Sequence, residues 1–451
     1  MTDAAEQLTL FHFPIWGGSH RAAWRLPETR IAPEEMFETH LRWARTCERG
    51  KIHCYFMADR LAIVGGEDTT IARSMPEHLI FDPATLQAAL ASVTDRIGLM
   101  ITIATSYDSP FHVARRTATA DHISGGRVGW NVVTGGGSDD APNFGMEHPD
   151  HSSRYERAEE FVDAVFALWD SFDDDAFVCD KDADLFWDPD KVRAPCYRGE
   201  LLATRGPLNV ARPPQGHPVI AQAGTSSPGR ALAARVGEAI FNFAQTIEEG
   251  RELRTDLHQR MAEYGREPNE ARFLPDITLL IGRTRDEIDE RLGRLDELVD
   301  VDRLLPDLSR FIGVDLAAHP LDGPVPEAPL SAGGQTMQRT LVRAAESEQL
   351  TIRQLAERFA RSIGHFVAGT PTEVADLMEG WMRAGAADGF VIRIADPEPS
   401  LDGFVDLVVP ELQRRGIFRT EYSGATFRED LGLPRPPSPA LAAGNRTRIA
   451  R

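Results

Sequence analysis

The segment AGTSSPG at residues 223–229 has the composition of a phosphate-binding turn. Gly224 lets the backbone approach a ligand closely, and either Ser226 or Ser227 can cap a helix that begins near Pro228. The first turn of such a helix offers free N–H groups and a partial positive charge, and both favour a phosphate group. An ordinary helix cap that binds no ligand explains the same residues about equally well.

Two other sites contain histidine. His151 and Tyr155 are four residues apart at the expected start of a helix, so they share one face and can reach the same ligand. The alternative is a partly exposed histidine beside a packed tyrosine. His20 lies in the glycine-rich segment WGGSHRAAWR and is a candidate general base or substrate-orienting group. A lone histidine is, however, more often structural.

The elements that must position these residues follow a regular pattern. Short apolar segments alternate with segments of helical periodicity, which is typical of repeated β-α units. We predict eight strands, at residues 8–13, 52–59, 96–105, 127–134, 217–224, 238–243, 273–282 and 388–394. Eight such units close a parallel barrel, so the predicted fold class is α/β, a (β/α)8 TIM barrel with insertions.

In a barrel of this kind, chemistry takes place at the carboxyl ends of the strands. Polar side chains occur at several of these predicted ends, namely Asp59, Thr105, Ser106, Asn131, Thr134 and Gln222. Each of them alone is more often a turn or capping residue. Their coincidence at one rim, together with the segment at 223–229, predicts a ligand site there.

Two segments are too long to be ordinary connections. Residues 170–215 include nine aspartates between 170 and 190 and are predicted to form an irregular excursion. Residues 300–360 combine a proline-rich stretch with a helix predicted over Gln335–Glu357, and this segment is a candidate lid or dimer contact. We therefore predict one barrel domain over residues 1–433 and a disordered, proline-rich tail over 434–451.

Composition excludes several classes of function. The chain has 451 residues and a formal net charge of −20, which disfavours nucleic acid as a partner. The start of the sequence lacks the pattern of a signal peptide, and no run of 18 apolar residues predicts a membrane span. The four cysteines show no metal-binding spacing, and no other metal motif is complete, so we expect a cytoplasmic protein without a metal.

Three longer segments carry a family resemblance. They are HISGGRVGWNVVTGG (122–136), HSSRYERAEEFVDAVFALW (151–169) and PVIAQAGTSSPGRALAA (218–234). They resemble the nitrilotriacetate, pristinamycin IIA synthase and dibenzothiophene-sulfone monooxygenase branch of the bacterial luciferase-like flavin enzymes. The likeness extends from about residue 8 to 433. It implies a two-component monooxygenase that receives reduced FMN from a separate NAD(P)H:flavin reductase. Such an enzyme uses O2 to oxidise, and in some members cleave, a small organosulfur, amine or xenobiotic substrate by way of a flavin peroxide.

The same resemblance assigns residues. It implies that the flavin contacts Asp59, Thr105, Asn131, His151, Tyr155, Ser226 and Ser227. The aspartate and asparagine would contact the ring or the ribityl chain, and the tyrosine and serine hydroxyls would hold the phosphate. A dry substrate pocket is expected at Phe13, Phe56, Phe243 and Phe311, although phenylalanines at strand positions also simply fill barrels. Phe311 stands where related sulfone monooxygenases carry a histidine, so a different substrate or activation is expected.

Two alternatives share the fold. One is an oxygen-independent oxidoreductase that uses a deazaflavin, and the other is a flavin-binding protein without catalytic activity. The resemblance also implies a homodimer or homotetramer, with the reductase as a transient functional partner.

Overall fold

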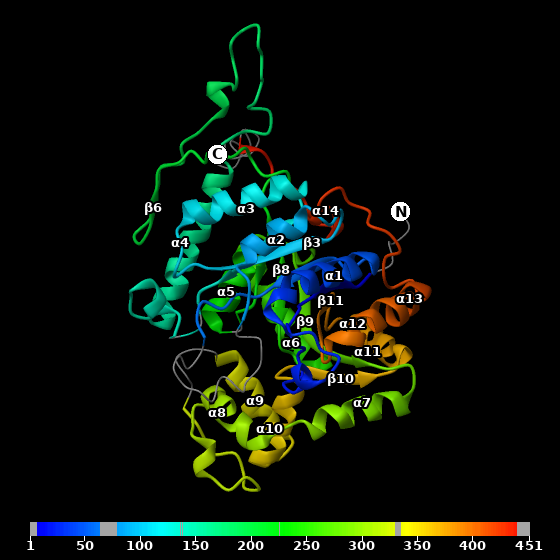
Figure 1. The fold of residues 1–451 in the computed structure, drawn as a ribbon. Helices are drawn as coiled ribbons and strands as arrows, with labels where there is room; N and C mark the ends of the chain where they lie inside the picture. The colour runs from blue at the N-terminus through cyan, green and yellow to red at the C-terminus, as the bar shows by residue number, and fades with distance from the viewer. Residues whose placement is uncertain are drawn as a thin grey trace.

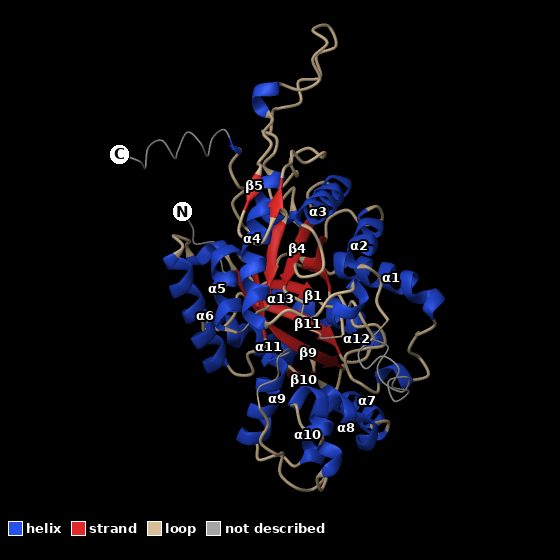
Figure 2. Ribbon diagram, turned by 90° about the vertical axis from the view of Figure 1, so that its left-hand side faces the viewer, coloured by secondary structure: helices blue, strands red, loops and turns tan. Residues whose placement is uncertain are grey.

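The chain is described from a computed structural model over residues 7–63, 79–135, 137, 139–224, 226–329 and 335–439. A parallel sheet lies at its centre, and helices surround the sheet (Figures 1 and 2). All eight predicted strands form: β1 (Thr9–His12), β2 (Cys54–Met57), β3 (Gly98–Ala104), β4 (Val128–Val133), β7 (Val219–Gln222), β8 (Ala239–Asn242), β9 (Arg272–Ile281) and β11 (Gly389–Ile394). They pair in the order β11-β1-β2-β3-β4-β7-β8-β9, and β9 pairs again with β11. The sheet therefore closes into the predicted (β/α)8 barrel.

Both faces of these strands are covered, which explains their apolar sequences. All seven residues of β3, GLMITIA, are buried. The surrounding helices are α1 (Met36–Arg49), α2 (Pro83–Ala91), α3 (Pro110–Ser124), α4 (His151–Trp169), α5 (Ser227–Val236), α6 (Ile247–Glu263), α7 (Arg285–Glu297), α11 (Pro371–Arg383), α12 (Pro397–Gly403), α13 (Val409–Arg414) and α14 (Phe427–Asp430). A π-helical turn, Phe404–Val408, joins α12 to α13. Among the described helices, none has the length and apolar character needed to cross a membrane.

The barrel has an additional strand that the sequence analysis missed. The first half of β9 pairs with β8, at Arg272–Pro275. Its second half pairs with β10 (His365–Gly369) on the same edge, while β11 occupies the other edge. Because β8 has only four residues and β9 has ten, β8 leaves this edge uncovered toward the carboxyl end. β10, which precedes α11, occupies this uncovered edge of β9. Its pairing brings residues of the preceding insertion to the mouth of the barrel.

The insertion between α7 and β10 forms a helical layer at the bottom of Figure 1. It contains α8 (Val301–Ile312), α9 (Gln335–Ser347) and α10 (Ile352–Arg361). The prediction of one helix over Gln335–Glu357 is therefore wrong. Gln349 adopts a positive φ of 52° between α9 and α10, and Thr351 begins α10 with a capping box. The layer has its own apolar core, made by Leu305, Leu308, Ile312, Leu341, Leu355 and Phe359 among others.

The excursion at 170–215 projects from the opposite end of the molecule (Figures 1 and 2). Its regular structure consists of a short 3-10 helix, Pro189–Lys191, and the antiparallel pair β5 (Tyr197–Arg198) and β6 (Ala203–Thr204). The first residues of the tail, which we predicted to be disordered, pack against it: Arg435 pairs with Asp174, and Arg212 donates to the carbonyl of Pro437. The predicted disorder from residue 440 onward lies outside the described residues.

Candidate active site

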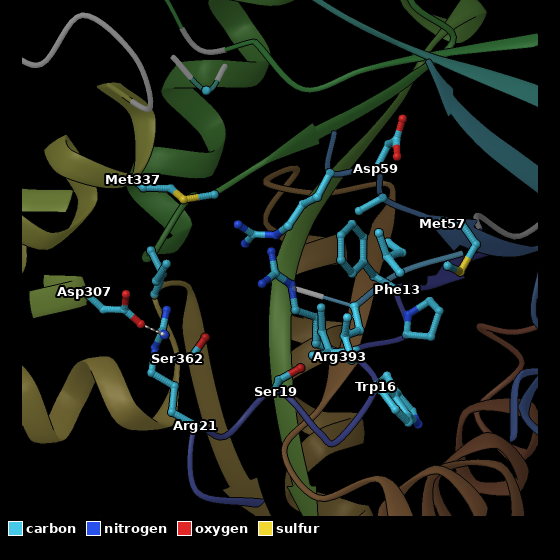
Figure 3. Close-up of a pocket in the computed structure, with 18 of the residues that line it drawn as sticks. Phe13, Trp16, Ser19, Arg21, Met57, Asp59, Asp307, Met337, Ser362 and Arg393 are labelled. Atoms are coloured by element: carbon cyan, nitrogen blue, oxygen red, sulfur yellow. Dashed lines mark hydrogen bonds and ion pairs between the residues drawn. The ribbon is translucent and has the colours of Figure 1, made fainter. Parts of the chain in front are cut away.

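A cavity of about 430 Å³ lies at the carboxyl-terminal mouth of the barrel, between the strand ends and the helical insertion (Figure 3). The strand ends contribute Phe13, Trp16, Ser19, Met57, Asp59 and Asp140, among others. The insertion contributes Asp307, Arg310, Phe311, Met337, Phe359 and Ser362. The cavity therefore exists only because the insertion covers the barrel, and its size suits a small organic molecule.

The four phenylalanines predicted to line a substrate pocket divide into two groups. Phe13 and Phe311 line the cavity. Phe56 and Phe243 are buried in the barrel core and are absent from the lining. The ring of Phe13 packs edge-on against Phe56 at 5.2 Å, and Phe241 packs in the same way against Phe243 at 4.8 Å. Phe56 and Phe243 thus fill the barrel interior and pack against Phe13 and Phe241, respectively.

A buried ion pair stands at the base of the cavity. Arg393 of β11 lies 2.7 Å from the carboxylate of Asp276 on β9, measured from Nε to Oδ1. The guanidinium also lies over the ring of Phe13, 4.8 Å from its centroid. Burial raises the pKa of Asp276 to about 6, although Arg393 opposes the shift. The sequence analysis missed this pair, yet a signal was available, since each residue is a charge within a mainly apolar strand.

Asp59 follows β2 and lines the cavity as predicted from its place at a strand end. Burial is the main reason why its pKa rises to about 6, and the nearby carboxylates of Asp82 and Asp140 add to the shift. The pKa of Asp140 is raised as well, mainly by burial. This side of the cavity is therefore rich in carboxyl groups, and Asp59 takes up a proton as pH falls through about 6.

A buried hydrogen bond also lies at the cavity wall. His40 lines the cavity, and its Nδ1 lies 2.7 Å from the hydroxyl of Tyr55. Burial lowers the pKa of His40 to about 4, so this imidazole is neutral at pH 7. Trp16 Nε1 and Ser19 Oγ, both buried, have no hydrogen-bond partner among the described residues. None of these four residues was identified from the sequence.

The helix cap predicted at Ser226 or Ser227 lies at the start of α5. Ser226 is the N-cap residue, and its side chain accepts from the amide of Gly229. Gly224 and Gly229 approach each other so closely that a Cβ on Gly224 would lie 2.7 Å from Gly229 Cα. The same Cβ would lie 2.9 Å from the hydroxyl of Tyr155, so this hydroxyl points at the helix start. His151 lies beside Tyr155, with ring centroids 5.0 Å apart and the ring planes tilted by 51°.

The remaining residues predicted to contact the flavin are Asn131, Thr105 and Ser227, and none of them lines the cavity. Asn131 on β4 is buried and donates from Nδ2 to Thr102 Oγ1 at 3.0 Å, whereas its Oδ1 has no partner among the described residues. Thr105 is buried at the end of β3, where its carbonyl accepts from Arg157 Nε of α4. Ser227 begins α5 and is exposed. Because β2, β3, β4 and β7 are successive neighbours, their ends place Asp59, Thr105, Asn131 and Ser226 in sequence around one rim.

His20 is not part of the cavity lining, unlike Ser19 and Arg21 on either side. Its side chain is fully buried, with Nδ1 accepting from the amide of Ala22 at 3.2 Å and Nε2 facing Asp296 at 3.7 Å. The imidazole thus connects the loop after β1 to α7. This geometry suits a residue that positions the loop, and it gives His20 no direct access to a ligand in the cavity.

Comparison with known proteins agrees with this architecture. The family described as luciferase-like monooxygenase matches residues 15–388. The chain belongs to this family. Nitrilotriacetate monooxygenase component A of Aminobacter aminovorans is 43% identical to it over 445 residues, which cover 96% of this chain and 98% of that protein. The resemblance predicted from the sequence is thereby confirmed.

Two further luciferase-like monooxygenases match along most of their length. Dibenzothiophene-sulfone monooxygenase of Rhodococcus erythropolis is 41% identical over 404 residues, with coverage of 87% of this chain and 89% of that protein. The solved structure of EDTA monooxygenase from Chelativorans sp. BNC1 superposes with a TM-score of 0.77 at 34% identity, covering 96% of this chain and 99% of that one. The chain is therefore a flavin-dependent monooxygenase.

Proposed function

We propose that this enzyme uses reduced FMN, supplied by a separate flavin reductase, and O2 to oxidise a small organic molecule in the cavity at the barrel mouth. The observation that carries the proposal is the glycine cradle at the start of α5, next to the Tyr155 hydroxyl and on the same rim as the cavity. The cradle suits a phosphate, and the rim residues between it and the cavity suit a flavin.

The residues present fit this cofactor. Gly224 and Gly229 let the turn pack closely against the start of α5, and Ser226, Tyr155 and the free N–H groups of α5 supply donors for a phosphate. Buried polar atoms rarely lack partners, yet Asn131 Oδ1 and Asn242 Nδ2 have none among the described residues. One is an acceptor and the other a donor, which matches the alternating polar edge of an isoalloxazine ring.

Reduced FMN supplies two electrons, so that one oxygen atom of O2 enters the substrate and the other leaves as water. The protein must keep bulk water away from this reaction, and the aromatic wall at Phe13 and Phe311 with the layer of α8 to α10 serves this purpose. Asp59, with a pKa of about 6, can hold or release a proton on its carboxylate near neutral pH. Neutral His40 can accept a hydrogen bond from the Tyr55 hydroxyl, which keeps its proton because burial raises the pKa of Tyr55.

The proposal is tested by supplying the components separately. Purified enzyme is expected to oxidise its substrate when given photoreduced FMN and O2, and not when given NADH alone. Turnover with NADH in the absence of a reductase would contradict the two-component scheme. Turnover without oxygen in the presence of a deazaflavin would favour the oxidoreductase alternative. Tight binding of FMN without turnover over a broad substrate panel would favour a flavin-binding protein.

Partners and substrate follow from the same proposal. We infer a transient encounter with the reductase, a homodimer or homotetramer, and a cytoplasmic setting that supplies NAD(P)H and keeps thiols reduced. The names of the relatives include both nitrilotriacetate and a sulfone, so relatives alone do not select a substrate class. Phe311 lies on the cavity side of α8 and packs on Phe359 at 5.5 Å, which gives the insertion wall an aromatic surface.

A further inference from the structure

Three charged side chains form one group on the insertion side of the cavity. Asp307 and Arg310 belong to α8, and Arg21 belongs to the loop after β1. Arg21 Nη1 donates to Asp307 Oδ2 at 3.2 Å, and Arg310 Nη2 donates to Asp307 Oδ1. The group thus contains two guanidinium cations and one carboxylate. It carries one more positive than negative charge in a partly desolvated place.

The two arginines differ in what they can offer to a ligand. Arg21 is nearly buried, and its guanidinium stacks on the ring of Phe359, 3.8 Å from the centroid. The side chain of Arg310 is 40% exposed. Among the described residues, Asp307 alone accepts a hydrogen bond from Arg310. Most of the donors of the Arg310 guanidinium are therefore available to a molecule in the cavity.

Other charges around the cavity direct an anion to the same place. Asp59 and Asp140 lie on the barrel side and repel an anion, and Arg60 is close enough to Asp140 to offset part of its charge. Arg393 is already paired with Asp276. Figure 3 shows Asp307 and Arg21 across the cavity from Asp59 and Met57.

We propose that the substrate of this enzyme is a small organic carboxylate, and that Arg310, held in place by Asp307 and Arg21, binds its carboxylate group. This inference rests on the proposed function, since it assigns the substrate class of the same cavity. A planar guanidinium presents two parallel N–H groups, and this fork matches the two oxygens of a carboxylate. With the carboxylate at Arg310, the rest of the molecule lies toward Phe13, Trp16 and Met57, where an apolar or weakly polar part is favoured.

The test measures binding without turnover. Calorimetric titration of the enzyme with acetate, succinate and tricarballylate is compared with titration by the uncharged triamide of tricarballylate. At least one carboxylate is expected to bind at millimolar concentration or below, and the triamide is not. Arg310→Gln is expected to weaken carboxylate binding by about tenfold or more, and Arg310→Lys by less, because lysine keeps the charge but loses the fork.

Arg303→Gln is the matched control, since Arg303 is on the same helix, pairs with Asp300 and does not line the cavity. Circular dichroism checks that each variant is folded. FMN binding, followed by quenching of flavin fluorescence, is measured separately and is expected to be equal in all of them. If the unaltered enzyme does not bind FMN, the proposed function is overturned. The carboxylate site would be overturned by any of three results obtained with normal FMN binding. These are no binding of any carboxylate, equal binding of the triamide, and equal effects of Arg310→Gln and Arg303→Gln.

Discussion

Gly224→Ala tests the phosphate cradle most directly. The new Cβ would lie 2.7 Å from Gly229 Cα and 2.9 Å from the Tyr155 hydroxyl oxygen, both too short for a Cβ and an unbonded heavy atom. Gly229 Cα belongs to the first turn of α5 and cannot move without moving the helix. The turn at Gly224 must therefore move relative to the start of α5, and the Tyr155 hydroxyl must shift as well, so the proposed phosphate position is disturbed. A hydrogen bond to a charged group contributes about 1.5–3 kcal/mol, so FMN is expected to bind roughly 10- to 100-fold more weakly.

The assay for this variant is fluorescence titration with FMN and with riboflavin, which has no phosphate. The affinity for FMN is expected to fall, while the affinity for riboflavin changes little. Gly293→Ala is the control, because that glycine lies on α7 and a Cβ there meets nothing within 4 Å. Unchanged FMN affinity in Gly224→Ala, or an equal loss for riboflavin, would refute the assignment of the phosphate to this cradle.

Three other substitutions have expected outcomes. Arg393→Gln leaves the Asp276 carboxylate buried without its cation, so the free energy of unfolding at pH 8 should fall by about 3–5 kcal/mol. At pH 5 Asp276 is protonated, so the loss should be smaller there. Urea unfolding that shows equal losses at both pH values would contradict this. The folded-state pKa of Asp59, about 6, exceeds its ordinary 3.8, so the stability it contributes is present below pH 3.8 and is lost as pH rises through 6. Asp59→Asn should thus be more stable than the unaltered enzyme at pH 7 and lose this advantage toward pH 4. His20→Ala should lower the melting temperature and leave kcat and KM unchanged, whereas a lower kcat in a fully stable variant would restore a catalytic role.

Local sequence determined the elements and several site residues. The eight strands were predictable because parallel strands buried on both faces are mainly apolar. The start of α5 was predictable because Ser226 followed by a proline at the second helical position is a local capping pattern. Polar residues at strand ends, such as Asp59, could be placed at the mouth because the order of strands fixes which ends share a rim.

The cavity itself was decided by tertiary packing. The insertion pairs β10 with the exposed edge of β9 and lays α8 across the mouth, and neither contact leaves a periodic signal in the chain. The same packing brings Arg310 to Arg21, which is 289 positions earlier in the sequence, through their shared partner Asp307. It also buries His20 outside the cavity, although its sequence neighbours line it. Burial and charge pairing depend on segments far apart in the chain. The sequence therefore identified candidate site residues, and only the tertiary structure determined which of them line the cavity.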